Sequence, residues 1–147
     1  MPRPVIRPAE DADWNAIAAL LQDCSLPLEG AREHLPAFLV AVGDGDVVGS
    51  AGLEVYGDVA LLRSVAVSPA WRGQGVGRAL AQAVYADAHR RGVKTLHLLT
   101  TTAAAYFSNL GFESETREHV PAALEASAEF HGACPSSAAY MSRNVNV

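Results

Sequence analysis

Residues 65–80 read VAVSPAWRGQGVGRAL, and the pattern within them changes twice. A short apolar run is broken at Ser68-Pro69, and glycines follow at positions 73, 75 and 77. Apolar residues then recur every four positions, as they do on one face of a helix: Val76, Leu80, Val84 and Ala88. The segment is therefore predicted to be a buried strand, a glycine-rich turn and the start of a helix.

A turn of this kind favours a bound anion. The first N–H groups of a helix lack acceptors, the helix dipole is positive at that end, and glycines without a Cβ let a phosphate come close. Five of the eleven basic residues also lie in this part of the chain: Arg72, Arg78, Arg90, Arg91 and Lys94. We therefore expect a phosphorylated ligand at the turn.

Two other phosphate motifs are excluded by their spacing. A dinucleotide fingerprint that begins at Gly73 requires a glycine where the chain has Arg78. A Walker loop requires Gly-Lys-Ser or Gly-Lys-Thr after the turn, and neither follows. The pattern that remains is Arg-x-x-Gly-x-Gly.

Residues 72–77, RGQGVG, resemble the acetyl-CoA pyrophosphate loop of the GNAT superfamily of N-acetyltransferases. Residues 102–112, TAAAYFSNLGF, resemble the second signature of that superfamily, a helix that ends in Leu-Gly-Phe beside the thioester. The order of expected strands and helices is similar almost from end to end. The resemblance implies one α/β GNAT-type domain over residues 1–147, with a mixed central sheet whose central strands splay and helices on both faces.

Three further segments resemble the small bacterial arsenic-resistance N-acetyltransferases: residues 52–64 (GLEVYGDVALLRS), 98–102 (LLTTT) and 134–138 (CPSSA). The Leu-Thr-Thr run, followed by a helix and Gly-Phe, is also similar to the acetyltransferase domain of N-acetylglutamate synthases. Both resemblances imply that the acceptor is an amino acid or an analogue, such as one that contains arsenic or phosphorus.

The composition agrees with one ordinary domain of 147 residues, of which 50% are hydrophobic and 18% charged. The formal net charge of -5 argues against general binding to nucleic acid or to an anionic membrane, both of which require a basic surface. The N-terminal residues lack the apolar core of a secretory signal, and Cys24 and Cys134 are far apart. We therefore expect a cytoplasmic protein with a small-molecule partner, and a homodimer is left open.

Apolar patterns predict the remaining elements. Strands are expected at residues 4–8, 38–42, 47–56, 59–67, 93–100, 112–115 and 138–141. Helices are expected at residues 11–23, 29–35, 75–91, 103–110 and 121–130. The run 59–67 is nearly all apolar, which is typical of a central strand that is covered on both faces.

The resemblance implies which residues hold acetyl-CoA. The backbone of Val65, Ala66 and Val67 pairs with the pantetheine arm as an added strand, and the N–H of Ala66 or Val67 polarises the thioester carbonyl. Phe107 borders the same ligand. The loop residues that hold the pyrophosphate are Arg72, Gly73, Gln74, Gly75, Val76, Gly77 and Arg78.

The acid that protonates the leaving thiolate has two candidates. Many members of the superfamily carry tyrosine four residues before the glycine of Leu-Gly-Phe, but this chain has Phe107 there and Tyr106 one residue earlier. A shift of one residue turns a helical side chain by about 100°, so Tyr106 is a candidate with packing as its alternative. Thr100 is the better placed hydroxyl by analogy with the glutamate-acetylating relatives. A thiolate can also leave unaided, because its conjugate acid is fairly strong.

The base and the substrate contacts are expected around the same cleft. Leu61 occupies the place of the superfamily's usual acidic residue, so Glu54 is the candidate base, directly or through water, with a solvated surface carboxylate as its alternative. Tyr56 and Thr101 are expected to contact the substrate. Arg63 interrupts an apolar strand and must reach a carboxylate, either of the substrate, which we favour, or of the protein.

The five histidines and two cysteines show no metal-ligand spacing, and no metal is expected. The predicted function is acetyl-CoA-dependent N-acetylation of a small amine with an acidic group, by direct transfer. Two alternatives stay open. One is a non-catalytic acyl-CoA sensor, since the usual tyrosine and strand acid are missing, and the other is acetylation of protein N-termini or lysines.

Overall fold

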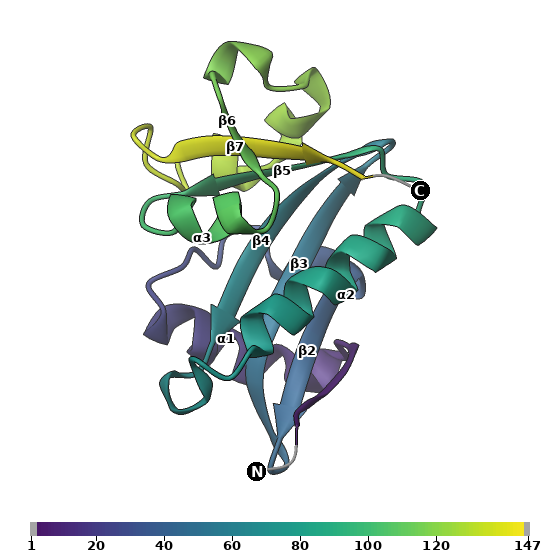
Figure 1. Cartoon of the computed structure of the whole chain (residues 1–147), viewed down its shortest axis with the longest axis vertical. Coiled ribbons are helices and arrows are strands. Elements are labelled where there is room, and N and C mark those ends of the chain that lie inside the picture. Colours follow the sequence, from purple (N-terminus) through teal and green to yellow (C-terminus); the bar gives the residue numbers. More distant parts are fainter. Residues whose placement is uncertain (1–2, 146–147) are drawn as a thin grey trace.

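A computed structural model describes residues 3–145, which form a mixed sheet of seven strands (Figure 1). The strands are β1 (Val5–Pro8), β2 (Phe38–Gly43), β3 (Asp46–Tyr56), β4 (Val59–Val67), β5 (Thr95–Thr100), β6 (Glu113–Glu115) and β7 (Ala139–Asn144). Their order across the sheet is β1-β2-β3-β4-β5-β7-β6. Among these neighbours β4 and β5 run parallel, because a helical crossover joins them, and the other pairs are antiparallel.

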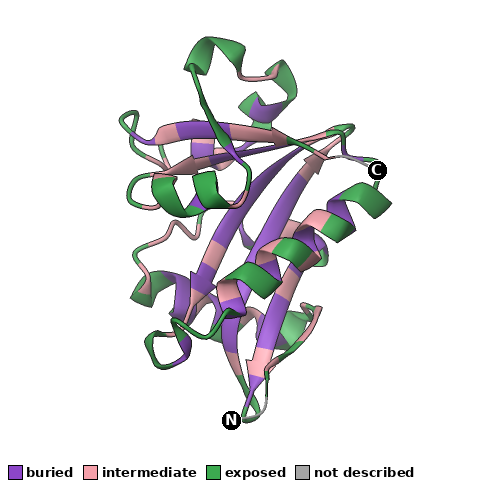
Figure 2. Cartoon of the chain, viewed as in Figure 1, coloured by how far each residue is buried: buried purple, intermediate pink, exposed green. Residues whose placement is uncertain are grey.

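Helices lie on both faces of the sheet. The α-helices are α1 (Trp14–Asp23), α2 (Val76–Arg90) and α3 (Ala104–Asn109). In Figure 1, α2 crosses the front of β2, β3 and β4, and α1 lies behind the sheet. Each of these two helices buries an apolar stripe, with Leu80 and Val84 on α2 and Ile17 and Leu21 on α1, against strands that are mostly buried in Figure 2. None of the helices in residues 3–145 is long and apolar enough to cross a membrane.

The remaining helical segments are short turns. They are η1 (Asp11–Asp13), η2 (Arg32–Ala37), η3 (Pro69–Trp71), η4 (Arg117–His119), η5 (Ala122–Ala126) and η6 (Ala128–Phe130), all of the 3-10 type. The predicted strands, and the predicted helices at 11–23, 75–91 and 103–110, are confirmed to within a few residues at their ends.

Two predicted helices are wrong. The segment 29–35 folds as loop and η2, which holds Pro36, a residue without a backbone donor. The segment 121–130 folds as η5 and η6 because its buried residues do not repeat at helical spacing over several turns. These turns therefore lie over the sheet as an irregular covering rather than as a helix.

The two central strands pair along only part of their length. The register of β4 with β5 joins residues 59–61 to residues 95–97, and the strands diverge beyond them. β4 continues to Val67 and β5 to Thr100 without pairing to each other. This confirms the splayed central strands, and it leaves one edge of β4 without a strand partner from Leu62 onward.

A β-bulge lies on β4 in the region where the strands part. The register with β3 changes between Ser50 and Gly52, so that Ser64 and Val65 together face one residue of β3. Ser64 has a φ of 59°, in the left-handed region that non-glycine residues rarely adopt. The buried Ser50 hydroxyl donates a hydrogen bond of 2.7 Å to the Ser64 carbonyl. Ser50 thus satisfies a carbonyl that the bulge displaces from the ladder.

The glycine at position 52 allows β3 to pack closely against an aromatic ring. A Cβ at Gly52 would lie 2.2 Å from Cε1 of Phe38, which is fully buried. A side chain at this position would therefore displace the ring. The glycine that weakens the strand pattern in the sequence has a packing role in the sheet.

We expect Ser50→Ala to lower the free energy of unfolding by about 1–3 kcal/mol, because the buried Ser64 carbonyl loses its donor. Thermal or urea unfolding measures the change. Ser114→Ala, in the exposed strand β6, is the control and is expected to alter the free energy by no more than about 0.5 kcal/mol. Equal stability of Ser50→Ala and wild type would contradict the role given to this hydrogen bond.

Candidate active site

A groove of about 860 Å³ opens where β4 and β5 part. Its walls include residues 62–67 of β4, residues 98–100 of β5 and the glycine loop after β4. Residues 24–27 and 133–135 also line it, from segments far apart in the sequence. Arg63 lies four residues before Val67, and a strand rises about 3.3 Å per residue, so the groove extends roughly 13 Å from the loop to Arg63.

The loop at one end of the groove has the geometry of an anion site. Gly75 is the N-cap of α2 with a φ of 82°, and Gly73 has a φ of 76°, both in the left-handed region. The N–H groups of residues 76–78 lie in the first turn of α2, where a helix offers no acceptor, and no other backbone acceptor is described for them within residues 3–145. A Cβ built on Gly73 or Gly75 meets nothing within 4 Å, so the space beside the loop is open to a phosphate.

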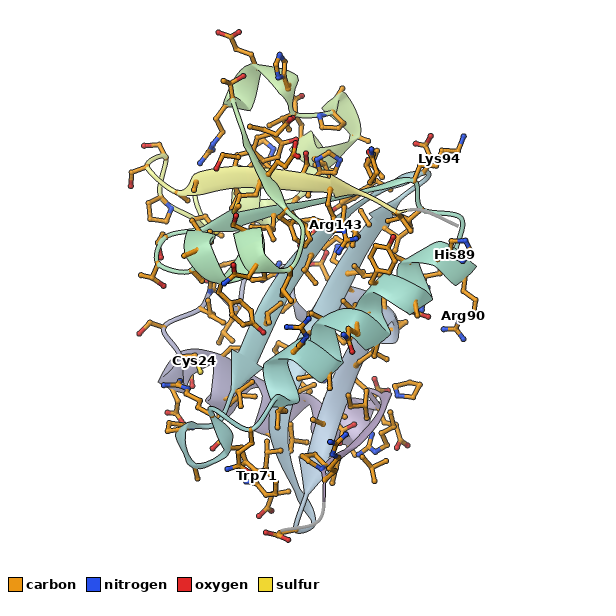
Figure 3. All side chains as sticks on the ribbon, viewed as in Figure 1. Cys24, Trp71, His89, Arg90, Lys94 and Arg143 are labelled. Carbon is orange, nitrogen blue, oxygen red and sulfur yellow. The ribbon has the colours of Figure 1, made fainter. Side chains whose placement is uncertain are left out.

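Side chains around the loop hold it in place. Trp71 is buried and its ring lies against Gly43 in the β2–β3 hairpin, where an added Cβ would come within 2.7 Å (Figure 3). The Arg72 Nε donates to the Val67 carbonyl at 3.0 Å, and Gln74 Nε2 donates to the Ala70 carbonyl at 3.2 Å. Gln74 is absent from the groove lining described here, whereas the other predicted loop residues line the groove.

The remaining residues predicted for acetyl-CoA also line the groove. Val65, Ala66 and Val67 border it along the open edge of β4, and Phe107 borders it from α3. The groove therefore brings together the backbone of the splayed strand and the N-terminus of α2. Both are suited to a ligand with a long polar arm and a pyrophosphate.

Tyr106 lines the groove rather than pointing away from it. Its hydroxyl lies 2.7 Å from the position that a Cβ on Gly77 would take, and its ring meets the Phe107 ring edge-on at 5.3 Å between centroids. Burial raises the pKa of the Tyr106 phenol, and the nearby Arg78 opposes this rise. A phenol in this environment stays protonated at neutral pH and can donate a proton.

Two threonines border the groove at the end of β5. Thr100 Oγ1 accepts a hydrogen bond of 3.0 Å from the Ala103 N–H, so its own hydroxyl proton is free to point elsewhere. Thr101 is exposed in the turn that follows. Both residues line the groove, and the roles expected for them, proton donor and substrate contact, stay predictions.

Arg63 is buried, and protein acceptors engage most of its guanidinium. Its Nη1 donates to the Glu54 carboxylate at 2.7 Å and to the Glu29 carbonyl at 2.8 Å. Its Nη2 donates to the Pro27 carbonyl at 3.0 Å and its Nε to Ser64 Oγ at 3.2 Å. Among the residues that the structure describes, this leaves one of the five N–H groups, on Nη2, without an acceptor. Arg63 lines the groove, but its side chain has no exposed area, so this N–H reaches a substrate only if the groups that cover it move.

Glu54 and Tyr56 lie beside Arg63 but are not among the residues that line the groove. Glu54 is fully buried, and the Tyr56 hydroxyl donates to its Oε1 at 2.5 Å. His34 lies 3.6 Å from the same oxygen. Burial is the main cause that raises the pKa of Tyr56, followed by its bond to Glu54. The solvated edge carboxylate that we weighed for Glu54 is therefore wrong, and its place outside the groove lining does not favour the role of base that we expected for it.

Glu129 was not predicted, and the structure places it in the groove lining next to Arg63. It is 4% exposed, and its Oε2 lies 3.5 Å from Arg63 Nε. Burial raises the pKa of its carboxyl to about 7; Glu54 and Glu29 add to this rise, while Arg63 and a hydrogen bond from Cys134 oppose it. No motif in the sequence marks Glu129, because it lies in short turns without periodicity.

Both cysteines line the groove at separate places. The Cys24 thiol lies at the end of α1, 3.5 Å from Arg72 Nη2 (Figure 3). The Cys134 thiol lies against Glu129, and burial raises its pKa to about 12. Within residues 3–145, no group of three or more His, Cys, Asp or Glu residues is arranged to hold a metal ion.

Comparisons with known proteins agree with this geometry. A family model described as an acetyltransferase (GNAT) domain matches residues 34–114. An amino-acid acetyltransferase of Neisseria meningitidis is 29% identical over 125 residues, which are 79% of this chain and 29% of that protein.

Two solved structures share the fold. An N-acetylglutamate synthase from Neisseria gonorrhoeae, complexed with coenzyme A and N-acetyl-glutamate, superposes with a TM-score of 0.85 at 24% identity and covers all of this chain. A Mycobacterium tuberculosis protein in complex with CoA and NLQ superposes with a TM-score of 0.80 at 25% identity, over 97% of this chain and 100% of that one. The chain spans only 29% and 36% of the two Neisseria proteins.

The family model covers more than half of the 147 residues, and the matched range includes the glycine loop and the splayed strands β4 and β5. The chain therefore belongs to the GNAT acetyltransferase family, in which acetyl-CoA is the co-substrate.

Proposed function

We propose that the protein transfers the acetyl group of acetyl-CoA to the amine of an amino acid or a close analogue. The observation that carries this proposal is the continuous groove, which joins the anion site of the glycine loop to the buried polar residues Arg63 and Glu129. One part of the groove suits a pyrophosphate, and the other suits a small charged acceptor.

Residues of this chain would hold the co-substrate along the open edge of β4. In the proposal, N–H groups of residues 76–78 and the Arg78 side chain bind the pyrophosphate, and the backbone of residues 65–67 pairs with the pantetheine arm. The N–H of Ala66 or Val67 donates to the thioester oxygen. Acetyl-CoA supplies the acetyl group in activated form, as a thioester.

The acceptor proposal rests on charge and on the relatives. Arg63 offers one N–H to the carboxylate of the acceptor. Glu129 lies in the same part of the groove, where its carboxylate can bind the ammonium group of the acceptor. Thr100, Thr101 and Tyr106 supply hydroxyls, of which Thr100 and Tyr106 are the proposed proton donors. The relative from Neisseria meningitidis is an amino-acid acetyltransferase. An arsenic- or phosphorus-containing amino-acid analogue fits the same requirements.

Direct transfer is favoured over a covalent acyl-enzyme. The Cys134 thiol, which faces the acceptor part of the groove, has a pKa of about 12 and is therefore not a thiolate at neutral pH. A single groove that holds both reactants brings the amine to the thioester without an intermediate carrier.

A panel of amino acids, their amides and simple amines, with thiol release from acetyl-CoA as readout, tests the proposal. We expect turnover with at least one amino acid and weaker turnover with its amide. Binding of acetyl-CoA in calorimetry without turnover of any amine would favour the acyl-CoA sensor. Turnover confined to peptides with a free N-terminus would favour protein acetylation.

We expect Gly75→Val to raise the dissociation constant for acetyl-CoA by tenfold or more, which is about 1.4 kcal/mol. The side chain would fill the open space beside the loop and is strained at a φ of 82°. Calorimetric titration measures the change. Gly57→Val is the matched control, since Gly57 has a φ of 69° and open space but lies in the β3–β4 turn. Equal affinity in the two variants would remove the loop from the site.

Arg63→Lys tests carboxylate recognition. Lysine cannot reproduce the guanidinium fork, so the melting temperature is expected to fall as the buried contacts to Glu54 and the two carbonyls are lost. The KM for the amino acid is expected to rise by a factor equivalent to about 1.5–3 kcal/mol. The KM for the corresponding amide and the KM for acetyl-CoA are expected to rise far less. Equal rises for the amino acid and the amide would leave Arg63 with a structural role alone.

A further inference from the structure

We propose that the Glu129 carboxylate is the general base that removes a proton from the acceptor ammonium group. The inference rests on the proposed function and names the residue that performs one step of it. It stands on the position of Glu129 in the groove and on its contacts with Arg63.

Glu129 is the buried carboxyl of the groove wall. Two carboxyl side chains line the groove within the described residues, those of Glu29 and Glu129. Glu29 is exposed to solvent, whereas Glu129 is 4% exposed. The Glu129 N–H donates to Ser127 Oγ at 3.2 Å, which fixes the start of η6 and hence the place from which the side chain extends. A base must reach its proton directly or through one water, and Glu129 meets that condition for a ligand in the groove.

Glu54 does not meet the same condition. Its two oxygens accept hydrogen bonds from the Tyr56 hydroxyl and from Arg63 Nη1, at 2.5 and 2.7 Å. It is fully buried and is absent from the groove wall described above. Both oxygens of Glu54 are therefore engaged by protein donors, and Glu54 does not border the space that an acceptor would occupy.

The surroundings of Glu129 suit a base at neutral pH. Burial raises the pKa of its carboxyl to about 7, with Glu54 and Glu29 adding to the rise, and Arg63 and the Cys134 thiol opposing it. Arg117 faces Cys134 from the neighbouring turn, and His34 faces Glu54. A carboxyl with this pKa is largely ionised at pH 8 and still basic enough to accept a proton from an ammonium group.

The proton balance of the step is simple. The Glu129 carboxylate takes one proton from the ammonium group and becomes a neutral carboxylic acid, which leaves a neutral amine. The amine nitrogen then forms the new C–N bond as the C–S bond breaks, and its second proton goes to the thiolate sulfur. Glu129 returns its proton to water, so that the net products are the amide, the thiol and one proton.

Glu54 acts on this base through Arg63 and is a positioning residue. Arg63 lies between the two carboxyls, with Nη1 at 2.7 Å from Glu54 Oε2 and Nε at 3.5 Å from Glu129 Oε2. The shorter contact holds the guanidinium to Glu54, and Glu129 receives only the longer one. Removal of the Glu54 charge should release Arg63 toward Glu129 and make the carboxylate of Glu129 easier to form.

The test compares the dependence of kcat/KM on pH in wild type, Glu129→Gln, Glu54→Gln and a control, Glu125→Gln, which changes an exposed carboxyl in η5. For wild type and the control we expect kcat/KM to rise with pH through a midpoint near pH 7. For Glu129→Gln we expect kcat/KM at pH 8 to be lower than that of wild type by 100-fold or more. The midpoint near pH 7 should be absent, and kcat/KM should instead keep rising tenfold per pH unit as free amine forms in solution. For Glu54→Gln we expect the midpoint to persist and to move to lower pH.

A second measurement does not depend on activity. The pKa of Glu129 is raised above its unfolded value, so the stability that its neutral form provides is present below about pH 4.5 and lost as pH rises through about 7. Over that window the melting temperature of wild type should fall relative to Glu129→Gln. A carboxyl NMR resonance that is missing in Glu129→Gln should titrate near pH 7.

The outcomes separate the two proposals. Two results would overturn the role of Glu129 as the base and leave the proposed function standing. One is turnover in Glu129→Gln that equals that of wild type. The other is a pH midpoint that is lost in Glu54→Gln and kept in Glu129→Gln. No turnover of any amine by wild type overturns both. A Glu129 resonance that titrates near pH 4 overturns the base whatever the activity.

Discussion

The separation of β4 from β5 is the constraint on which the rest of the structure depends. The parallel ladder ends after residues 61 and 97, so the backbone of β4 beyond them has no strand on one side. Backbone donors and acceptors inside a protein need partners, and a groove floored by such an edge is therefore a binding site for an extended polar ligand. The bulge at Ser64, the loop after Val67 and the groove all lie along this open edge.

A buried cation holds the other wall of that groove. Arg63 on β4 reaches the carbonyls of Pro27 and Glu29, the carboxylate of Glu54 and the side chain of Glu129. A charge in the interior is stable only when its hydrogen bonds are satisfied, so these contacts hold the loop before η2 and the turns after β6 against the sheet. The irregular parts of the fold are positioned by one guanidinium rather than by regular secondary structure.

Local sequence signals predicted the parts of the molecule that depend on neighbouring residues. The apolar run 59–67, the hairpin between β2 and β3, and the loop at residues 73–77 each carry their own pattern, and each is found as expected. The two carbonyls that accept from Arg63, those of Glu29 and Pro27, are 34 and 36 residues away, and no pattern within a strand or a helix could identify them. Glu129 lies in turns without periodicity, and the inward direction of Tyr106 depends on how α3 packs. The features that local patterns did not predict are therefore those that depend on contacts between distant parts of the chain.

Apart from Glu129, the turns η4, η5 and η6 form a part of the molecule that can vary while the half that holds the co-substrate stays unchanged. They lie at the top of Figure 1, outside the layers formed by α1 and α2, and Arg117 joins them to the Ala138 carbonyl at 2.9 Å. Insertions or exchanges in this segment would reshape the acceptor wall, while the glycine loop, Trp71 and the helix cores stay as they are. For a protein engineer, the segment is the natural place to build libraries of altered acceptor preference on an unchanged donor half.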